Sequence, residues 1–350
     1  MKILIIGAGG FIGSHLCEEI LKSHKDWRVI AADITSDKIR HLMSEGNFDF
    51  RRIDILTDLA RTEESVEECD AVFPLAAIAN PRIYVQDPLR VFELDFEANL
   101  RIVKWAAKYG KRLIFPSTSE VYGMCRDEEF TEEGSDCVTG PICKQRWIYS
   151  CSKQMLDRVI YACGIRDNLR YTLFRPFNWV GPRLDDINDE GGRSRVVTQF
   201  LSNILYGKDL VLADGGAQIR CFTFIADGID ALIKITENKD NCADGQIFNI
   251  GNPYNRCSIR ELANRILRLA ERYPQLKDSV AKIKIVDAAS SDYYGKSYQD
   301  VLKRVPSVKK AEELLGWKPI TGMDELLIKT MDFCFGAAGG QLRPDRSLQI

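Results

Sequence analysis

The strongest constraint on the fold comes from the first thirteen residues. An apolar run over residues 3–6 leads directly into glycines at positions 7, 9, 10 and 13. A buried strand that turns through glycines into a helix is how a βαβ unit holds a dinucleotide pyrophosphate. In that arrangement Gly7 permits the tight turn, Gly10 lets the backbone approach the phosphates, and Gly13 lets the helix pack closely on the sheet. The sequence therefore predicts a dinucleotide-binding α/β fold.

An acidic residue stands where the second expected strand ends. Residues 27–33 read as a strand that closes on Asp33, 20 residues after the last glycine. A carboxylate there accepts hydrogen bonds from ribose hydroxyls and repels a 2′-phosphate, so the sequence favours NAD over NADP. A third strand is expected over 50–55, where Asp54 and Ile55 either frame the adenine or simply cap the strand.

Strands and helices alternate through the first half of the chain. Strand patterns occupy 2–7, 27–33, 50–55, 71–77, 112–119 and 171–178, and helical patterns occupy 12–23, 91–109 and 145–163. This alternation is typical of a parallel doubly wound sheet. We therefore expect a Rossmann-type doubly wound parallel sheet, with a smaller C-terminal α/β substrate-binding lobe.

The character of the chain changes after residue 180. A loop rich in Gly, Asp and Arg is expected over 181–195. Beyond it we expect helices at 196–206, 226–238, 259–272 and 308–315, strands at 210–214, 220–225 and 246–251, and an irregular stretch at 285–308. We expect 1–180 to form the NAD-binding domain, with segments near 220–252 returning to it. Residues 181–335 would mainly form the substrate-binding lobe, and 336–350 a tail with loop composition.

Tyr149 and Lys153 are four residues apart in the helical pattern 145–163. Side chains at this spacing lie on one face of a helix. An ammonium beside a phenol stabilises the phenolate, so the tyrosine can act as a base near neutral pH. A dinucleotide site and a Tyr-Lys base together predict hydride chemistry on an alcohol.

Composition excludes several other classes of protein. The formal net charge of −2 implies no general attraction to nucleic acid. No apolar stretch approaches the roughly 18 residues that span a membrane. The 11 cysteines are an odd number and contain no Cys-x-x-Cys pair, which argues against structural zinc and a disulfide framework and favours the reducing cytoplasm. We expect no metal.

Four motifs, taken in chain order, resemble the extended short-chain dehydrogenases/reductases, the group of nucleotide-sugar epimerases, dehydratases and decarboxylases. They are the glycine turn, Ser117–Ser119, the Tyr149/Lys153 pair and Arg175-Pro-x-Asn178. Longer segments at 115–125, 146–149, 175–185, 220–223 and 290–300 are most similar to the UDP-glucuronate decarboxylase domain of the bacterial lipid A aminoarabinose pathway. The resemblance covers about residues 1–335. The chain departs from it at Pro74, where a His is common, and at Phe224, where the lipid A enzyme has an Asp.

The resemblance assigns roles to individual residues. Catalytic roles would fall to Tyr149, Lys153, Thr118, Ser119, Glu120 and Arg304. Contacts with NAD would come from Gly7, Gly10, Phe11, Ile12, Gly13, Asp33, Asp54, Ile55, Ala76, Tyr149 and Lys153. Contacts with the sugar nucleotide, UDP-glucuronate, would come from Ala79, Tyr84, Arg146, Asn178, Arg220, Tyr298 and Arg304. Enzymes of this group pair through the helix that bears the tyrosine and the helix near 91–109, so a homodimer is expected.

By the same resemblance, Tyr149 would take the proton of the sugar C4 hydroxyl, which Thr118 or Ser119 would hold. Glu120 and Arg304 would assist the loss of CO2 and the protonation that follows. Because a guanidinium is a poor general acid, we expect Arg304 to bind the carboxylate or a phosphate. Arg146 would pair with the glucuronate carboxylate.

Three other functions stay open at the level of sequence. The first is UDP-apiose/xylose synthesis, although Ser119 stands where the plant enzymes commonly have Cys. The second is C4 epimerisation of a UDP-uronate, in which the carboxylate survives. The third is a non-catalytic NAD-binding sensor, against which the intact Tyr149/Lys153 pair argues.

Overall fold

The computed structural model describes residues 1–189 and 194–336. Within them, seven parallel strands form the main sheet in the order β11-β6-β5-β4-β1-β2-β3. The strands are β1 (Lys2–Ile6), β2 (Arg28–Asp33), β3 (Phe48–Arg52), β4 (Ala71–Pro74), β5 (Arg112–Pro116), β6 (Tyr171–Pro176) and β11 (Gln246–Ile250). The strand order reverses between β1 and β4, and ligands of open parallel sheets bind beside the carboxyl ends of strands at such a point. The expected doubly wound parallel sheet is confirmed.

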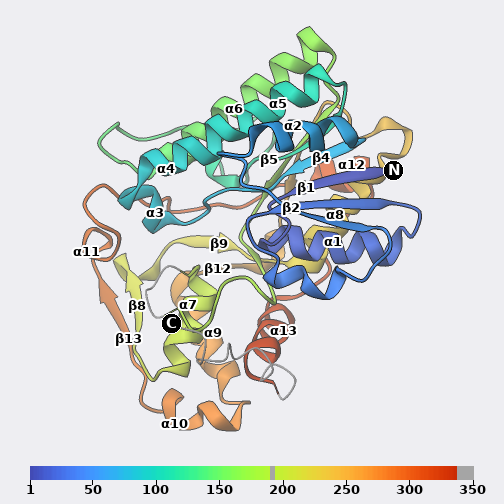
Figure 1. The fold of residues 1–350 in the computed structure, drawn as a ribbon. Helices are drawn as coiled ribbons and strands as arrows, with labels where there is room; N and C mark the ends of the chain where they lie inside the picture. Colours follow the sequence, from blue (N-terminus) through green and yellow to red (C-terminus); the bar gives the residue numbers. More distant parts are fainter. Residues whose placement is uncertain (190–193, 337–350) are drawn as a thin grey trace.

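Helices cover both faces of this sheet (Figure 1). One face carries α1 (Phe11–Ser23) and α8 (Ile225–Glu237), and the other carries α2 (Leu59–Glu68), α5 (Asn99–Lys108) and α6 (Trp147–Asp167). Because strand side chains alternate, Ile3 and Ile5 enter the core beneath α1, while Leu4 and Ile6 enter the core beneath α2 and α5. Strand β1 is apolar on both faces because both faces of the sheet are covered, whereas the edge strand β3 carries Asp49, Arg51 and Arg52.

The expected helix 91–109 is continuous but not uniform. It consists of α4 (Pro88–Phe92), a π-helical segment η2 (Glu93–Ala98) and α5. Single π-helical turns inside α-helices often mark functional positions. Here the wider turn carries Asp95, which is fully buried.

The remaining segments build the smaller lobe and the connections. The helices are α3 (Pro81–Gln86), α7 (Val196–Leu205), α9 (Ile259–Ala270), α10 (Lys277–Val280), α11 (Ser290–Tyr294), α12 (Lys309–Leu315) and α13 (Met323–Phe335). Short strands pair as β7 (Trp179–Val180) with β10 (Thr223–Phe224), β8 (Leu210–Ala213) with β13 (Ile285–Ala288), and β9 (Ile219–Cys221) with β12 (Arg256–Ser258). Turns of 3-10 helix are η1 (Asp37–Leu42), η3 (Ser119–Tyr122), η4 (Asp214–Gly216), η5 (Lys239–Asn241), η6 (Pro253–Asn255) and η7 (Pro274–Leu276).

Two expectations about this lobe are wrong. The stretch 285–308 is not irregular throughout, since it contains β13 and α11. These elements are four and five residues long, too short for a periodic pattern, and β13 owes its place to pairing with the distant β8. The single strand expected at 220–225 is instead two short strands, β9 and β10, which join different sheets.

Strand β11 lies at the edge of the main sheet beside β6, so the chain does return to that sheet after residue 220. The tail expected at 336–350 lies, apart from Gly336, outside the described residues. No helix in the described ranges is both long enough and apolar enough to cross a membrane.

Close packing of the glycine turn predicts a stability effect. A Cβ on Gly13 would lie 2.3 Å from the carbonyl oxygen of Gly7, whereas a Cβ on Gly46 would have no atom within 4 Å. Gly13→Ala should therefore lower the free energy of unfolding by about 1–3 kcal/mol, the usual cost of overpacking. Gly46→Ala is the control and should stay within about 0.5 kcal/mol of wild type. Urea denaturation measures both, and equal midpoints would refute the close-packing argument.

Candidate active site

A cavity of about 650 Å³ lies beside the carboxyl ends of the sheet strands, between the sheet and the smaller lobe. This volume suits a small-molecule or cofactor site. Its lining from the sheet side includes Gly7, Gly10, Phe11, Ile12, Gly13, Thr118, Ser119, Glu120, Tyr149 and Lys153. Its lining from other segments includes Ala79, Tyr84, Asn178, Arg220, Tyr298 and Arg304. Most of the residues singled out from the sequence are thus brought together in one place.

The glycine turn forms the cofactor end of this cavity. Gly7 has a positive φ of +84°, and a Cβ there would lie 2.6 Å from the backbone nitrogen of Ala76. Helix α1 begins after Gly10, and no side chain among the described residues caps its first turn. A helix N-terminus approached through glycines offers free N–H groups and a positive dipole end to a pyrophosphate. The turn therefore fits a dinucleotide.

Asp33 is held beside the same turn. Its Oδ2 accepts a hydrogen bond of 2.9 Å from the backbone N–H of Gly9, and its Oδ1 accepts one of 3.0 Å from that of Thr35. These two bonds fix the carboxylate at the end of β2. The expected position of Asp33 for a ribose contact is consistent with this placement, and the role itself stays a prediction.

The lining of the cavity, as the described residues define it, does not include the expected cofactor contacts Asp33, Asp54, Ile55 and Ala76. The Oδ1 of Asp54 accepts a hydrogen bond of 2.9 Å from the backbone N–H of Leu56, so this carboxylate does cap the turn after β3. Ile55 is buried in the core beneath α2 and α5. An adenine contact from Asp54 or Ile55 remains a prediction.

The Tyr149/Lys153 pair lies at the centre of the cavity. The Lys153 ammonium donates a 3.0 Å hydrogen bond to the carbonyl oxygen of Pro116 and lies 6.0 Å from the centre of the Tyr149 ring. The ring of Tyr84 stacks on that of Tyr149, with centroids 4.6 Å apart and planes at 8°. This stacking fixes the plane of the phenol.

The sequence led us to expect a lowered pKa at Tyr149, and that expectation is wrong for the protein by itself. Burial raises the pKa of Tyr149, the Asp95 carboxylate raises it further, and a hydrogen bond with Thr118 opposes the rise. Burial also lowers the pKa of Lys153. The phenol therefore needs an additional positive charge nearby before it can act as a base at neutral pH.

Asp95 is a residue that the sequence analysis missed. Its Oδ1 lies 3.9 Å from the Lys153 ammonium, and its Oδ2 accepts a 3.0 Å hydrogen bond from the backbone N–H of Ile78. Burial raises the pKa of Asp95 to about 6, against the opposing effect of Lys153. A signal was present, because Asp95 is in helical phase with the buried Val91 and Ile102, and an acid on an apolar helix face needs a partner.

Glu120 is the centre of a buried ionic cluster. Its Oε2 accepts a 2.5 Å hydrogen bond from Arg146, and its Oε1 lies 2.6 Å from Nη1 of Arg304. Burial alone would raise the pKa of Glu120, but Arg146, Arg304 and Arg220 bring it down to about 2. The arrangement presents a fixed carboxylate and its guanidinium partners beside Ser119.

Several expected substrate contacts are already engaged within the protein. Arg146 also donates a 2.9 Å hydrogen bond to the carbonyl oxygen of Gln299, and it is not part of the cavity lining among the described residues. Arg220 donates a 2.9 Å hydrogen bond to Asp300, and Asn178 donates one of 3.1 Å to the carbonyl oxygen of Cys221. Arg146 therefore positions Glu120, and its expected contact with a substrate carboxylate stays a prediction.

The sequence analysis assigned no role to Tyr293 and Tyr294, which line the cavity together with the expected Tyr298. Tyr294 stacks on Tyr298 with ring centroids 4.2 Å apart, and the guanidinium of Arg82 lies 4.8 Å from the centre of the Tyr293 ring. The contact between Arg82 and Tyr293 joins α3 to α11, which lie next to each other in Figure 1. The recurrence of tyrosine at positions 293, 294 and 298 was the available signal.

Comparisons with known proteins agree with this geometry. The sequence pattern of the NAD-dependent epimerase/dehydratase family matches residues 3–251. This chain belongs to that family. NAD is therefore its cofactor, and the glycine turn and Asp33 described above fit that group.

Solved structures extend the likeness over the whole chain. The PbgP3 protein from Burkholderia pseudomallei is 47% identical, covers 97% of each chain and has a TM-score of 0.88. UDP-glucose 4-epimerase from Thermotoga maritima is 25% identical, with coverage of 95% and 98% and a TM-score of 0.75. UDP-glucuronic acid 4-epimerase from Bacillus cereus, solved with UDP-glucuronic acid and NAD, shares the fold at 24% identity and a TM-score of 0.78, with coverage of 95% of this chain and 98% of that one.

The Glu120 cluster predicts a specific dependence of stability on pH. The pKa of Glu120 is about 2 in the folded protein, against the ordinary value of 4.5 that applies to the unfolded chain. The stabilising effect of this carboxylate is therefore present above pH 4.5 and is lost as the pH falls toward 2. Glu120→Gln should lower the free energy of unfolding at pH 7 by about 3–5 kcal/mol, because buried guanidiniums lose their counter-charge. It should also flatten the acid limb of the stability curve.

The measurement is urea denaturation at pH 7, 4.5 and 3. Glu128→Gln serves as the matched control, since Glu128 forms an exposed salt bridge with Lys303 and should leave stability near that of wild type. An unchanged acid limb in Glu120→Gln would show that this carboxylate is not the group that titrates.

Proposed function

We propose that this protein catalyses the NAD-dependent oxidative decarboxylation of UDP-glucuronate. The product would be a UDP-4-keto-pentose, or UDP-xylose if the ketone is reduced again before release. The observation that carries the proposal is the Glu120 carboxylate held by Arg146 and Arg304 beside the Tyr149 phenol. The resemblance of segments 115–125 and 290–300 to UDP-glucuronate decarboxylases supports it.

Oxidation at the sugar C4 needs a base and a means of holding the hydroxyl. In the proposal, the Tyr149 phenol takes the hydroxyl proton, and Thr118 or Ser119 holds the hydroxyl by hydrogen bond. NAD, when bound, supplies the hydride acceptor and a positively charged ring. Lys153 adds a second positive charge to the site, and its ammonium is held by the hydrogen bond to the carbonyl oxygen of Pro116.

Oxidation of the C4 hydroxyl turns the substrate into a β-keto acid, which loses CO2 readily because the electron pair flows into the ketone. The protein then needs only to place groups and provide a proton at C5. Arg304 and Arg220 line the cavity and offer cations to the carboxylate and the diphosphate. A substrate carboxylate bound to Arg304 would compete with the Glu120 carboxylate for that guanidinium. The pKa of Glu120 would then rise toward the range in which it can donate a proton.

C4 epimerisation of the same substrate is the second candidate. It is favoured by the family, which includes epimerases, and it shares the oxidation step. It differs in outcome, because the carboxylate survives. UDP-apiose synthesis is less favoured, since Ser119 lines the cavity where the plant enzymes commonly have Cys.

We also propose a homodimer that pairs through α5 and α6. Both helices lie on the outside of the sheet (Figure 1). On α6, the side chains of Met155, Tyr161 and Ile165 are 51%, 55% and 71% exposed. Exposed apolar side chains on one helix are typical of an interface.

The eleven cysteines all lie in the described residues as free thiols, which supports the proposed cytoplasmic location.

Mass spectrometry of the products from UDP-glucuronate and NAD tests the proposal. The expected result is a product that has lost CO2, with NADH absorbance if the ketone is released. A product of unchanged mass that separates from UDP-glucuronate would establish epimerisation instead. An unaltered substrate would overturn both functions.

Tyr149→Phe tests the assignment of the base. Loss of the phenol should lower kcat by about 10²–10⁴-fold, the usual contribution of a general base. The affinity for NAD should stay the same, because the glycine turn and Asp33 are untouched. Tyr161→Phe removes an exposed hydroxyl on the same helix and should leave kcat unchanged. Equal kcat values for the two variants would remove Tyr149 from the chemistry.

A further inference from the structure

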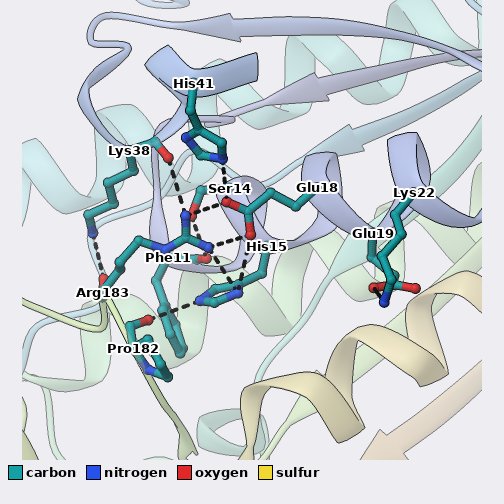
Figure 2. A network of polar contacts seen from close by, with 10 residues as sticks. All are labelled: Phe11, Ser14, His15, Glu18, Glu19, Lys22, Lys38, His41, Pro182 and Arg183. Carbon is teal, nitrogen blue, oxygen red and sulfur yellow. Dashed lines mark hydrogen bonds and ion pairs between the residues drawn. The ribbon is translucent and has the colours of Figure 1, made fainter. Parts of the chain in front are cut away.

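Arg183 lies where the chain leaves β7 for the smaller lobe, and its side chain turns back onto helix α1 (Figure 2). Its Nη1 and Nη2 donate hydrogen bonds of 2.5 and 2.6 Å to the two carboxylate oxygens of Glu18. A bidentate arginine–carboxylate salt bridge of this kind is among the strongest polar contacts that proteins make. The Glu18 carboxylate also lies 2.7 Å from Nε2 of His41.

His15 adds a second connection to the same segment. Its Nε2 lies 2.9 Å from the carbonyl oxygen of Pro182, and its Nδ1 lies 3.0 Å from Nη2 of Arg183. A carbonyl can only accept, so Nε2 carries the proton and Nδ1 accepts from the guanidinium. Burial, with help from Arg183, lowers the pKa of His15 to about 4, so the ring is neutral at physiological pH.

Lys38 supplies the third connection, from η1. Its ammonium donates a 2.7 Å hydrogen bond to the carbonyl oxygen of Arg183, and Nη1 of Arg183 donates one of 3.3 Å to the carbonyl oxygen of Lys38. These contacts hold Arg183 at a φ of +66°, a left-handed conformation that costs a non-glycine residue free energy. Such a conformation persists only where surrounding contacts over-determine it.

The Arg183 network, defined as Arg183 with Glu18, His15, Lys38 and Pro182, joins three sides of the cofactor end of the cavity. Helix α1 begins with the cavity-lining residues 11–13, and η1 begins four residues after Asp33. Leu184 and Asp185, next in the chain to Arg183, also line the cavity. Asp185 in turn accepts a 2.7 Å hydrogen bond from Arg195, whose guanidinium lies 5.5 Å from the centre of the Phe11 ring.

We propose that Arg183 is a positioning residue for the cofactor, and that its network slows the dissociation of the bound dinucleotide. Residues 182–185 can separate from α1 and η1 only if the ion pair with Glu18 and the bonds with His15 and Lys38 all break. Such coupled contacts act mainly on the rate of dissociation. The proposal depends on the NAD site, which family membership establishes, and is independent of whether the reaction is a decarboxylation.

Two variants test it. Glu18→Gln keeps the size of the side chain but removes the charge that pairs with Arg183. Arg183→Lys keeps the charge but loses the planar fork, so it serves if Glu18→Gln folds poorly. Glu19→Gln is the matched control, because Glu19 is the next residue on α1 and, within the described part of the chain, its carboxylate forms a salt bridge only with the exposed Lys22, at 3.4 Å (Figure 2).

The experiment loads each protein with NADH and chases it with excess NAD, following NADH fluorescence by stopped flow. We expect NADH to leave Glu18→Gln and Arg183→Lys roughly tenfold faster than wild type, equivalent to about 1.4 kcal/mol. Glu19→Gln should match wild type. The affinity for UDP, measured by calorimetry, should be the same in all four proteins, because the substrate end is not altered.

Two results would overturn the proposal. One is release of NADH from both network variants at the wild-type rate. The other is a loss of UDP affinity in proportion to the faster release, which would mean that the variants damage the fold in general. Failure of the product analysis with UDP-glucuronate would leave these rates unchanged, so the two proposals fail separately.

Discussion

The Glu120 carboxylate, shared between Arg146 and Arg304, ties the fold to the site. Glu120 follows β5, Arg146 immediately precedes α6, and Arg304 comes from the smaller lobe. Buried charges are tolerated only when they are paired, so these three segments can meet in one arrangement and few others. The same pairing sets the electrostatics of the cavity floor. The ion pairs of Glu120 therefore contribute both to the stability of the fold and to the geometry of the site.

The two ends of the cavity are built on different principles. The cofactor end is made of backbone, and glycines allow the close approach that side chains would block. The end proposed for the substrate is lined by Arg220 and Arg304, which pair with Asp300 and Glu120. Between them lies Tyr149, whose pKa burial and Asp95 raise. A base whose pKa is raised in this way needs a further positive charge nearby before it can act at neutral pH.

The patterns within short stretches of sequence were sufficient for the fold class and the cofactor. The glycine turn, the alternation of strands and helices, and the spacing of Tyr149 and Lys153 each depend on residues close together in the chain. Such features are fixed by backbone geometry and by strand or helix periodicity, so they survive without knowledge of the packing. Most helices of ten residues or more were found in place, although α2 and α13 were not among the expected elements. Strand β13 and helix α11 were missed because they are too short for a period to show.

Tertiary structure alone decided which charges meet. Nothing in the sequence pairs Glu120 with both Arg146 and Arg304, places Asp95 beside Lys153, or turns Arg183 back onto Glu18 across 165 positions. A pKa depends on burial and on the charges nearby, which is why the pKa of Tyr149 is raised in the protein by itself although Lys153 lies close to it. The sequence by itself determined the scaffold and the identity of its chemical groups. The folded packing determined their protonation, their partners and their accessibility, because these are properties of neighbours in space and not of neighbours in the chain.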